Sequence, residues 1–270
     1  MQINFLIPSL LGLVVGLLMG LTGSGGGIVS VPLLIFGLGL QLNVAAPIAL
    51  ASMAVSAGLG AYLGFRAKIL RYKAAALMSA TGLVLSPFGL WVSHLIPDKP
   101  LIIGFGVLLI FVSIRMLVQA QHSLKSNLPT PRTAALCELN PDTGKFTWTR
   151  SCLSVLFITG GTTGFLSGLL GVGGGFMLVP ALRKFTNLPM QSIVATTLGV
   201  IAIVSAGSAL MASATGDMNW SIATPFICGS VIGLMLGRKL IERLHSSRVQ
   251  QVFAVFTFCI ALELIYKNIF

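Results

Sequence analysis

Charged side chains are scarce in this chain. They make up 9% of its 270 residues, whereas a soluble globular protein carries about 25%. Acidic residues are the rarest, with 6 Asp and Glu against 17 Lys and Arg. Apolar runs of roughly 20 residues, the length that crosses a ~30 Å hydrocarbon core, recur from end to end. The scarcity of charge excludes a soluble domain and predicts an all-α polytopic membrane protein.

The chain also lacks the residue patterns of metal centres and catalytic sites. Its 4 cysteines form no CxxC pair and have no histidine at ligand spacing, so we interpret them as small hydrophobic residues in helices plus one loop thiol. No Ser/His, paired-Asp or His-rich constellation lies in the apolar runs, which predicts no enzyme, no metal and no cofactor. The net charge of +11 comes from basic residues in short loops, and membrane topology explains these better than a nucleic-acid partner.

One glycine-rich stretch occurs twice, 148 residues apart. The first copy, Gly16–Pro32, reads GLLMGLTGSGGGIVSVP, and the second, Gly164–Pro180, reads GFLSGLLGVGGGFMLVP. Their glycines and the closing proline fall in register. The chain is therefore predicted to hold two copies of one unit, residues 1–120 and 151–270, joined by a polar linker over residues 121–150.

Three adjacent glycines break a helix, so each repeat is predicted to open with a broken, re-entrant helical hairpin and to continue with three transmembrane helices. This gives about 8–10 helical segments in all. The predicted segments cover residues 3–21, 28–38, 44–65, 74–96, 101–120, 152–170, 176–185, 192–214, 222–244 and 249–269.

Basic residues predict the orientation, because Lys and Arg accumulate in cytoplasmic loops. They cluster at residues 66–73 in the first repeat and at 238–248 in the second, one loop later. The linker is then cytoplasmic, both termini lie outside, and all but Lys99 and Lys267 of the 17 Lys and Arg face the cytoplasm. The two repeats are thus predicted to have inverted topology about an axis in the membrane plane.

The glycine triplets are predicted to bind an anion. Non-helical backbone survives at membrane depth only where protein or water satisfies its polar groups, and the free N–H groups of the following helix attract negative charge. A nucleotide-binding P-loop is excluded, because neither copy continues to Gly-Lys-Ser/Thr. The predicted substrate-binding residues are Thr22, Gly23, Ser24, Gly25, Gly26, Gly27, Gly171, Gly173, Gly174, Gly175, Thr196 and Thr197.

Some of these features have plainer explanations. The outer glycines of each copy form small-xxx-small patterns, for which we favour tight helix packing: Gly16, Gly20, Gly164 and Gly168. Hydroxyl groups in helices commonly bond back to helix carbonyls, which applies to Ser52, Ser56, Thr196, Thr197 and Ser205. Among acidic residues only Glu263 lies within an apolar run, so we see no proton relay.

The pattern GLxGxGGGxxxxP at Gly20–Pro32 and Gly168–Pro180 resembles the sulfite exporter TauE/SafE family over nearly the whole chain. The run Ala195-Thr-Thr-Leu198 also resembles the family, whereas Ala46-Pro-Ile-Ala49 departs from it. The resemblance implies transport of small sulfur-containing anions across a bacterial inner membrane.

We therefore predict a secondary transporter that exports sulfite or organosulfonates such as sulfoacetate by alternating access. An anion channel, an uptake transporter for sulfate- or thiosulfate-like anions and a non-transporting scaffold stay open as alternatives. The predicted partners are the small anion and the lipid bilayer, with a homodimer left open.

Overall fold

The computed structural model describes residues 5–23, 26–125, 137, 149–214, 218–241 and 246–269. Within these ranges the chain forms ten helices and no strand. They are α1 (Leu6–Thr22), α2 (Gly26–Leu38), α3 (Leu42–Arg66), α4 (Tyr72–Leu95), α5 (Asp98–Lys125), α6 (Arg150–Leu170), α7 (Gly175–Phe185), α8 (Met190–Ala214), α9 (Trp220–Ile241) and α10 (Ser246–Ile269).

Each predicted segment corresponds to one of these helices, with ends that differ by a few residues. Six helices (α3, α4, α5, α6, α8 and α9) are long and apolar enough to cross a membrane. The all-helical, multi-pass prediction is therefore confirmed. The helices after the two glycine breaks are short, as predicted: α2 has 13 residues and α7 has 11, or about 20 and 17 Å at 1.5 Å per residue.

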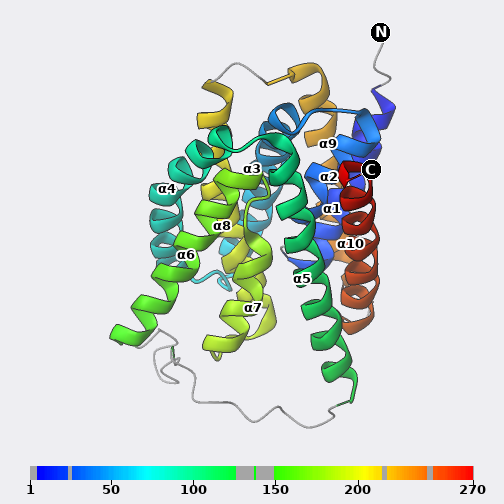
Figure 1. The fold of residues 1–270 in the computed structure, drawn as a ribbon. Coiled ribbons are helices and arrows are strands. Elements are labelled where there is room, and N and C mark those ends of the chain that lie inside the picture. The colour runs from blue at the N-terminus through cyan, green and yellow to red at the C-terminus, as the bar shows by residue number, and fades with distance from the viewer. Residues whose placement is uncertain are drawn as a thin grey trace.

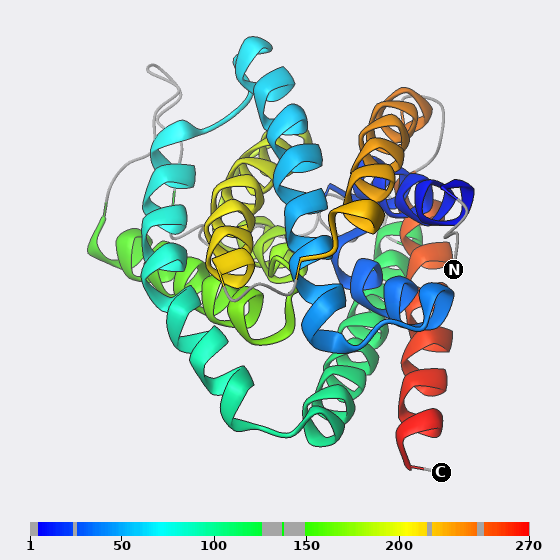
Figure 2. The ribbon, with the colours of Figure 1, turned by 90° about the horizontal axis from the view of Figure 1, so that it is seen from above.

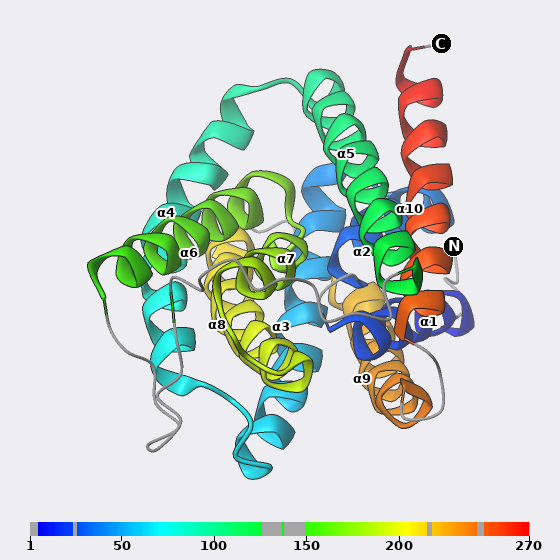
Figure 3. The ribbon, with the colours of Figure 1, turned by 90° about the horizontal axis from the view of Figure 1, so that it is seen from below.

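Helices pack in pairs, and each pair joins one helix before the linker with one after it. The pair α3–α8 occupies the centre, with α4–α6 on one side and α1–α9 on the other, while α5–α10 lies along a further side (Figures 2 and 3). The central pair is antiparallel: Gly64, near the end of α3, faces Ala195 near the start of α8. Helices from the two halves of the sequence are therefore interleaved.

The two helical hairpins enter the molecule from opposite ends. In Figure 1, α1 descends from the top and α2 returns towards it, while α6 rises from the bottom and α7 returns downwards. The end of α10 lies in the upper part beside the start of α1, while α5 ends at the lower right and α6 begins at the lower left. The two glycine breaks thus approach the centre of the molecule from opposite directions.

Glycines set the closest helix contacts. On α1, Gly16 faces the backbone carbonyl of Ser230 on α9, and on α6, Gly164 faces that of Gly82 on α4. A β-carbon at either glycine would overlap the facing carbonyl oxygen, and Gly20 and Gly168 meet α9 and α4 in the same manner. The predicted packing role of these four outer glycines is confirmed, since only a residue without a side chain permits this approach.

Candidate functional site

Both helix breaks use glycines in the left-handed backbone region. Gly23 ends α1 with φ of 77°, and Gly171 ends α6 with φ of 69°. Gly173 and Gly174 follow with φ of 68° and 60°, so three of the four residues between α6 and α7 adopt a conformation that side chains disfavour. Ser24 and Gly25, the corresponding part of the first break, lie outside the described residues.

The two breaks meet. A β-carbon added to Gly27 would lie 2.7 Å from the Val172 carbonyl oxygen and 2.7 Å from the Met53 sulfur. One added to Gly173 would lie 2.8 Å from the same sulfur. The buried thioether of Met53 therefore touches the first turn of α2 and the segment between α6 and α7. We call this meeting point, formed by Gly27, Met53, Val172 and Gly173, the glycine junction.

The glycine junction lies halfway along the central pair. Met53 is near the middle of α3, and Gly173 also faces Ile201 near the middle of α8. Each break also rests on the central helix of the other half of the chain: Gly23 on Val194 of α8, and Gly171 on Ala46 of α3. The short helices α2 and α7 therefore begin at mid-height in the bundle.

The start of α7 has the properties of an anion site. Its N-terminal residue is preceded by Gly174, and no described side chain caps it. Backbone N–H groups in the first turn of a helix have no carbonyl partner within the helix and carry partial positive charge. Gly26 and Gly27 occupy the same position in α2. Four predicted site residues, Gly26, Gly27, Gly174 and Gly175, thus lie at two neighbouring helix N-termini.

A pocket of about 100 Å³ reaches the second break. Its walls are the first turns of α3, including Asn43 and Ala46, the end of α6 from Gly168 to Gly171, and parts of α4, α5 and α8. The pocket lies at the end of the molecule where α3 begins, opposite to the end of α5 (Figure 1). It places a small cavity directly beside Gly171.

The predicted hydroxyl ligands differ in their surroundings. The Thr196 hydroxyl donates to the Ser192 carbonyl at 2.6 Å, and Thr197 donates to the Val194 carbonyl at 2.9 Å. Thr22 likewise donates to the Leu18 carbonyl, at 2.7 Å. Bonding back to helix carbonyls is thus confirmed for both threonines of α8. Neither is at the glycine junction, and Thr196 also accepts a hydrogen bond from the backbone N–H of Arg71 in the α3–α4 loop.

The serines of the central helices behave otherwise. Ser52 and Ser56 on α3 each form a hydrogen bond of 2.7 Å with the hydroxyl of Ser230 on α9. The expectation that these two serines bond back to carbonyls of their own helix is therefore wrong. Ser205 on α8 is fully buried, and its hydroxyl has no hydrogen-bond partner within the described residues. A β-carbon at Gly173 would lie 2.9 Å from that hydroxyl oxygen.

The sequence model of the sulfite exporter TauE/SafE family matches residues 9–264, which include both breaks and every helix that carries them. The chain belongs to this family. It is 27% identical to "probable membrane transporter protein YunE" of Bacillus subtilis (strain 168) over 99% of each chain. It is 29% identical to a "probable membrane transporter protein" of Xylella fastidiosa (strain Temecula1) over 95% of this chain and 93% of that one.

A more distant relative is archaeal: "probable membrane transporter protein MJ0441" of Methanocaldococcus jannaschii is 27% identical over 87% of this chain and 88% of its own. No solved structure matches the chain. The resemblance inferred from the glycine pattern is therefore confirmed, and this TauE/SafE protein is a membrane transporter.

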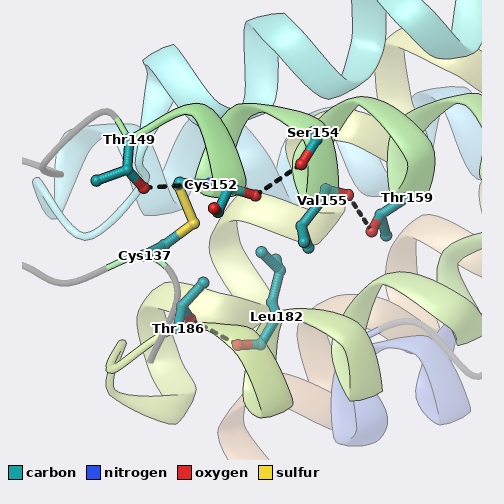
Figure 4. Close-up of a disulfide and its surroundings, with 9 residues drawn as sticks. Cys137, Thr149, Cys152, Ser154, Val155, Thr159, Leu182 and Thr186 are labelled. Carbon is teal, nitrogen blue, oxygen red and sulfur yellow. Dashed lines mark hydrogen bonds between the residues drawn. A yellow bond between two sulfur atoms is a disulfide. The ribbon is translucent and has the colours of Figure 1, made fainter. Parts of the chain in front are cut away.

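One interpretation is wrong: two of the cysteines in this TauE/SafE protein form a disulfide. Cys137 and Cys152, 15 residues apart in sequence, are joined with their α-carbons 5.0 Å apart (Figure 4). Cys152 lies in the first turn of α6, and the Cys137 N–H donates to the Phe185 carbonyl, at the end of α7, at 3.1 Å. Residue 137 is thereby attached to both ends of the α6–α7 hairpin. The pairing depends on residue 137 lying beside this hairpin, which the spacing of the cysteines in the sequence does not reveal.

Sequence reasoning missed Met53 as a site residue and placed Ser205 among ordinary helix-bonded hydroxyls. Neither lies in a motif, and a methionine in an apolar helix is most often a core residue. Only the arrangement of α3, α8 and the two breaks brings them to the glycine junction.

Proposed function

We propose that this TauE/SafE protein is a secondary transporter that exports small sulfur-containing anions, sulfite or organosulfonates such as sulfoacetate, by alternating access. The anion binds at the N-termini of α2 and α7. The observation that carries this proposal is the glycine junction, where two short helices begin side by side in the middle of the bundle. Helix N-termini in this arrangement bind an anion through backbone N–H groups and need no buried arginine.

The composition of the buried residues supports an anion held by neutral groups. The buried polar side chains that the structure describes are all Ser and Thr. Backbone that is not helical is tolerated at membrane depth where it lines a substrate site. Glycine is required there because the backbone takes left-handed conformations and because the two breaks approach each other closely.

The packing supports inverted repeats and alternating access. Residues 148 positions apart occupy equivalent places in the two halves. The contact of Gly16 with Ser230 is therefore equivalent to that of Gly164 with Gly82. The contact of Gly23 with Val194 is likewise equivalent to that of Gly171 with Ala46. Such exchange is what a two-fold axis between the halves produces. Because α3 and α8 are equivalent and antiparallel, that axis runs across the helices, as in transporters with repeats of opposite orientation.

Export is the direction that the membrane potential favours. An anion that leaves an inside-negative cell gains about 2.3 kcal/mol per charge per 100 mV. Uptake of the same anion requires a coupling ion, usually held by an ionisable side chain at depth. Glu263, the acidic residue in an apolar run, is exposed on the outer surface of α10. The proposal therefore needs no co-transported cation.

Two other activities fit the same fold. An anion channel would use the same site without alternating access, and it would show neither saturation nor counterflow. An uptake transporter for sulfate- or thiosulfate-like anions would show accumulation that depends on an ion gradient. We place the linker in the cytoplasm of a bacterial inner membrane, with both termini outside.

Thermal unfolding of the purified protein in the presence of anions tests the proposal. The panel is sulfite, sulfoacetate, thiosulfate, sulfate, taurine and acetate. A ligand at 100 times its dissociation constant stabilises the folded state by about 2.7 kcal/mol. We expect one sulfur anion to raise the melting temperature selectively, and we expect Gly174→Leu to abolish the shift because its side chain would overlap the backbone of Thr163. A sulfur anion that shifts both proteins equally would contradict the site.

A further inference from the structure

The hydroxyl group of Ser205 is placed unlike those of its neighbours on α8. The hydroxyls of Thr196, Thr197 and Ser208 all donate to carbonyls of their own helix. The Ser205 hydroxyl is fully buried, makes no hydrogen bond among the described residues, and faces Gly173 in the segment that precedes α7. A buried hydroxyl without a partner costs free energy that the fold must supply elsewhere.

We propose that Ser205 is a substrate ligand: its hydroxyl donates a hydrogen bond to an oxygen atom of the anion bound at the N-terminus of α7. This inference rests on the proposed function and deepens it. The unused hydroxyl faces Gly173, two residues before the first residue of α7, whose N-terminus has no side-chain cap. We infer that one sulfonate or sulfite group satisfies both. The thioether of Met53 fills the space beside Gly173, and its flexible side chain has to move aside when the anion enters.

The two repeats differ in sequence at the positions that could supply this hydroxyl. In the repeat alignment, Ser205 of α8 corresponds to Ala57 of α3, whose side chain has no polar group. Ser24 in the first glycine stretch corresponds to Val172 in the second. At the second break, Ser205 therefore supplies a hydroxyl donor that the side chain of Val172 does not provide.

The inference is tested by measuring flux in proteoliposomes that contain the wild-type protein or a variant. The substrate is the sulfur anion that gave the thermal shift. A hydrogen bond to a charged group is worth about 1.5–3 kcal/mol, which corresponds to a factor of roughly ten to one hundred in affinity. We expect Ser205→Ala to raise the half-saturating anion concentration at least about tenfold. The matched control is Ser113→Ala, which removes another fully buried hydroxyl without a partner among the described residues, on α5, a helix that contributes no residue to the glycine junction. Its half-saturating concentration should be unchanged.

Thermal unfolding separates a ligand from a structural hydroxyl. Without anion, Ser205→Ala should be as stable as wild type or more stable, because the variant removes an unsatisfied polar group. At an anion concentration that saturates the wild-type protein, the same variant should show a smaller rise in melting temperature than the wild type. A variant that is less stable without anion would overturn the inference, since the hydroxyl would then have a structural partner.

The double variant Ala57→Ser, Ser205→Ala moves the hydroxyl to the equivalent position of α3. We expect it to recover part of the affinity. If the wild-type protein transports the anion and Ser205→Ala has the same half-saturating concentration, the Ser205 assignment is overturned. The proposed function then still stands. Absence of flux and of thermal shifts with all six anions in the wild type overturns the proposed function, and the Ser205 assignment falls with it.

Discussion

The α-carbon of Gly27 faces the backbone carbonyl of Val172, so closely that a β-carbon would lie 2.7 Å from the carbonyl oxygen. Residues from the two repeats thus touch through their backbones at the centre of the bundle. A side chain at position 27 has no free space, because Met53 occupies the other side. This contact links the sequence repeat to a single site built from both halves.

Replacing Gly27 therefore tests the glycine junction. We expect Gly27→Leu to reduce anion flux at least about tenfold, since overpacking typically costs 1–3 kcal/mol and separates the two helix N-termini. The protein should still insert, because the change leaves the apolar spans intact. Gly104→Leu is the matched control: a β-carbon there meets no atom within 4 Å. Equal flux in both variants would show that the junction is not the transport site.

The outer glycines should govern stability and not substrate affinity. A β-carbon at Gly164 would overlap the Gly82 carbonyl, whereas one at Gly58 would have its nearest neighbour, the Ala202 side chain, at 3.9 Å. We expect Gly164→Ala to lower the free energy of unfolding by about 1–3 kcal/mol, and Gly58→Ala to be neutral or stabilising because alanine favours helix. Melting temperatures in detergent measure both. Equal melting temperatures for the two variants would contradict the packing role.

Thiol counting tests the disulfide. In purified protein without reductant, we expect only Cys228 and Cys259 to react with a maleimide after denaturation, and all four cysteines to react after reduction. The bond closes a 15-residue loop, and the chain-entropy estimate for that length is about 3 kcal/mol. Cys137→Ser should destabilise the protein by up to this amount, and Cys228→Ser should not. Four reactive thiols before reduction would disprove the pairing.

The orientation can be measured at the two ends of α3. Gln41 precedes this helix and Lys68 follows it, and both are exposed. In a background with Cys228→Ser and Cys259→Ser, a membrane-impermeant maleimide should label Gln41→Cys in intact cells, and Lys68→Cys only after permeabilisation. The reverse pattern would place the linker outside. It would also place the Cys137–Cys152 disulfide in an oxidising compartment, where such bonds normally form.

Much of this protein follows from local sequence properties. The scarcity of charge requires burial in lipid, runs of apolar residues require helices, and three consecutive glycines end a helix wherever they occur. For these reasons the ten helices, the two breaks between Thr22 and Gly26 and between Leu170 and Gly175, and membership of the TauE/SafE family could be predicted. The repeat also revealed which glycines are equivalent.

Contacts between residues far apart in sequence were decided only by the tertiary structure. Helices from the two halves of the chain are interleaved, so Met53 of one half meets Gly173 of the other, and Cys137 is bonded to Cys152 at the start of α6. Thr196 and Ser205 carry similar hydroxyls on one helix, yet one is bonded to its own helix and the other faces the glycine junction. The difference comes from the segment between α6 and α7, which packs against one face of α8 at Ser205. Helical periodicity alone contains no information about that neighbour.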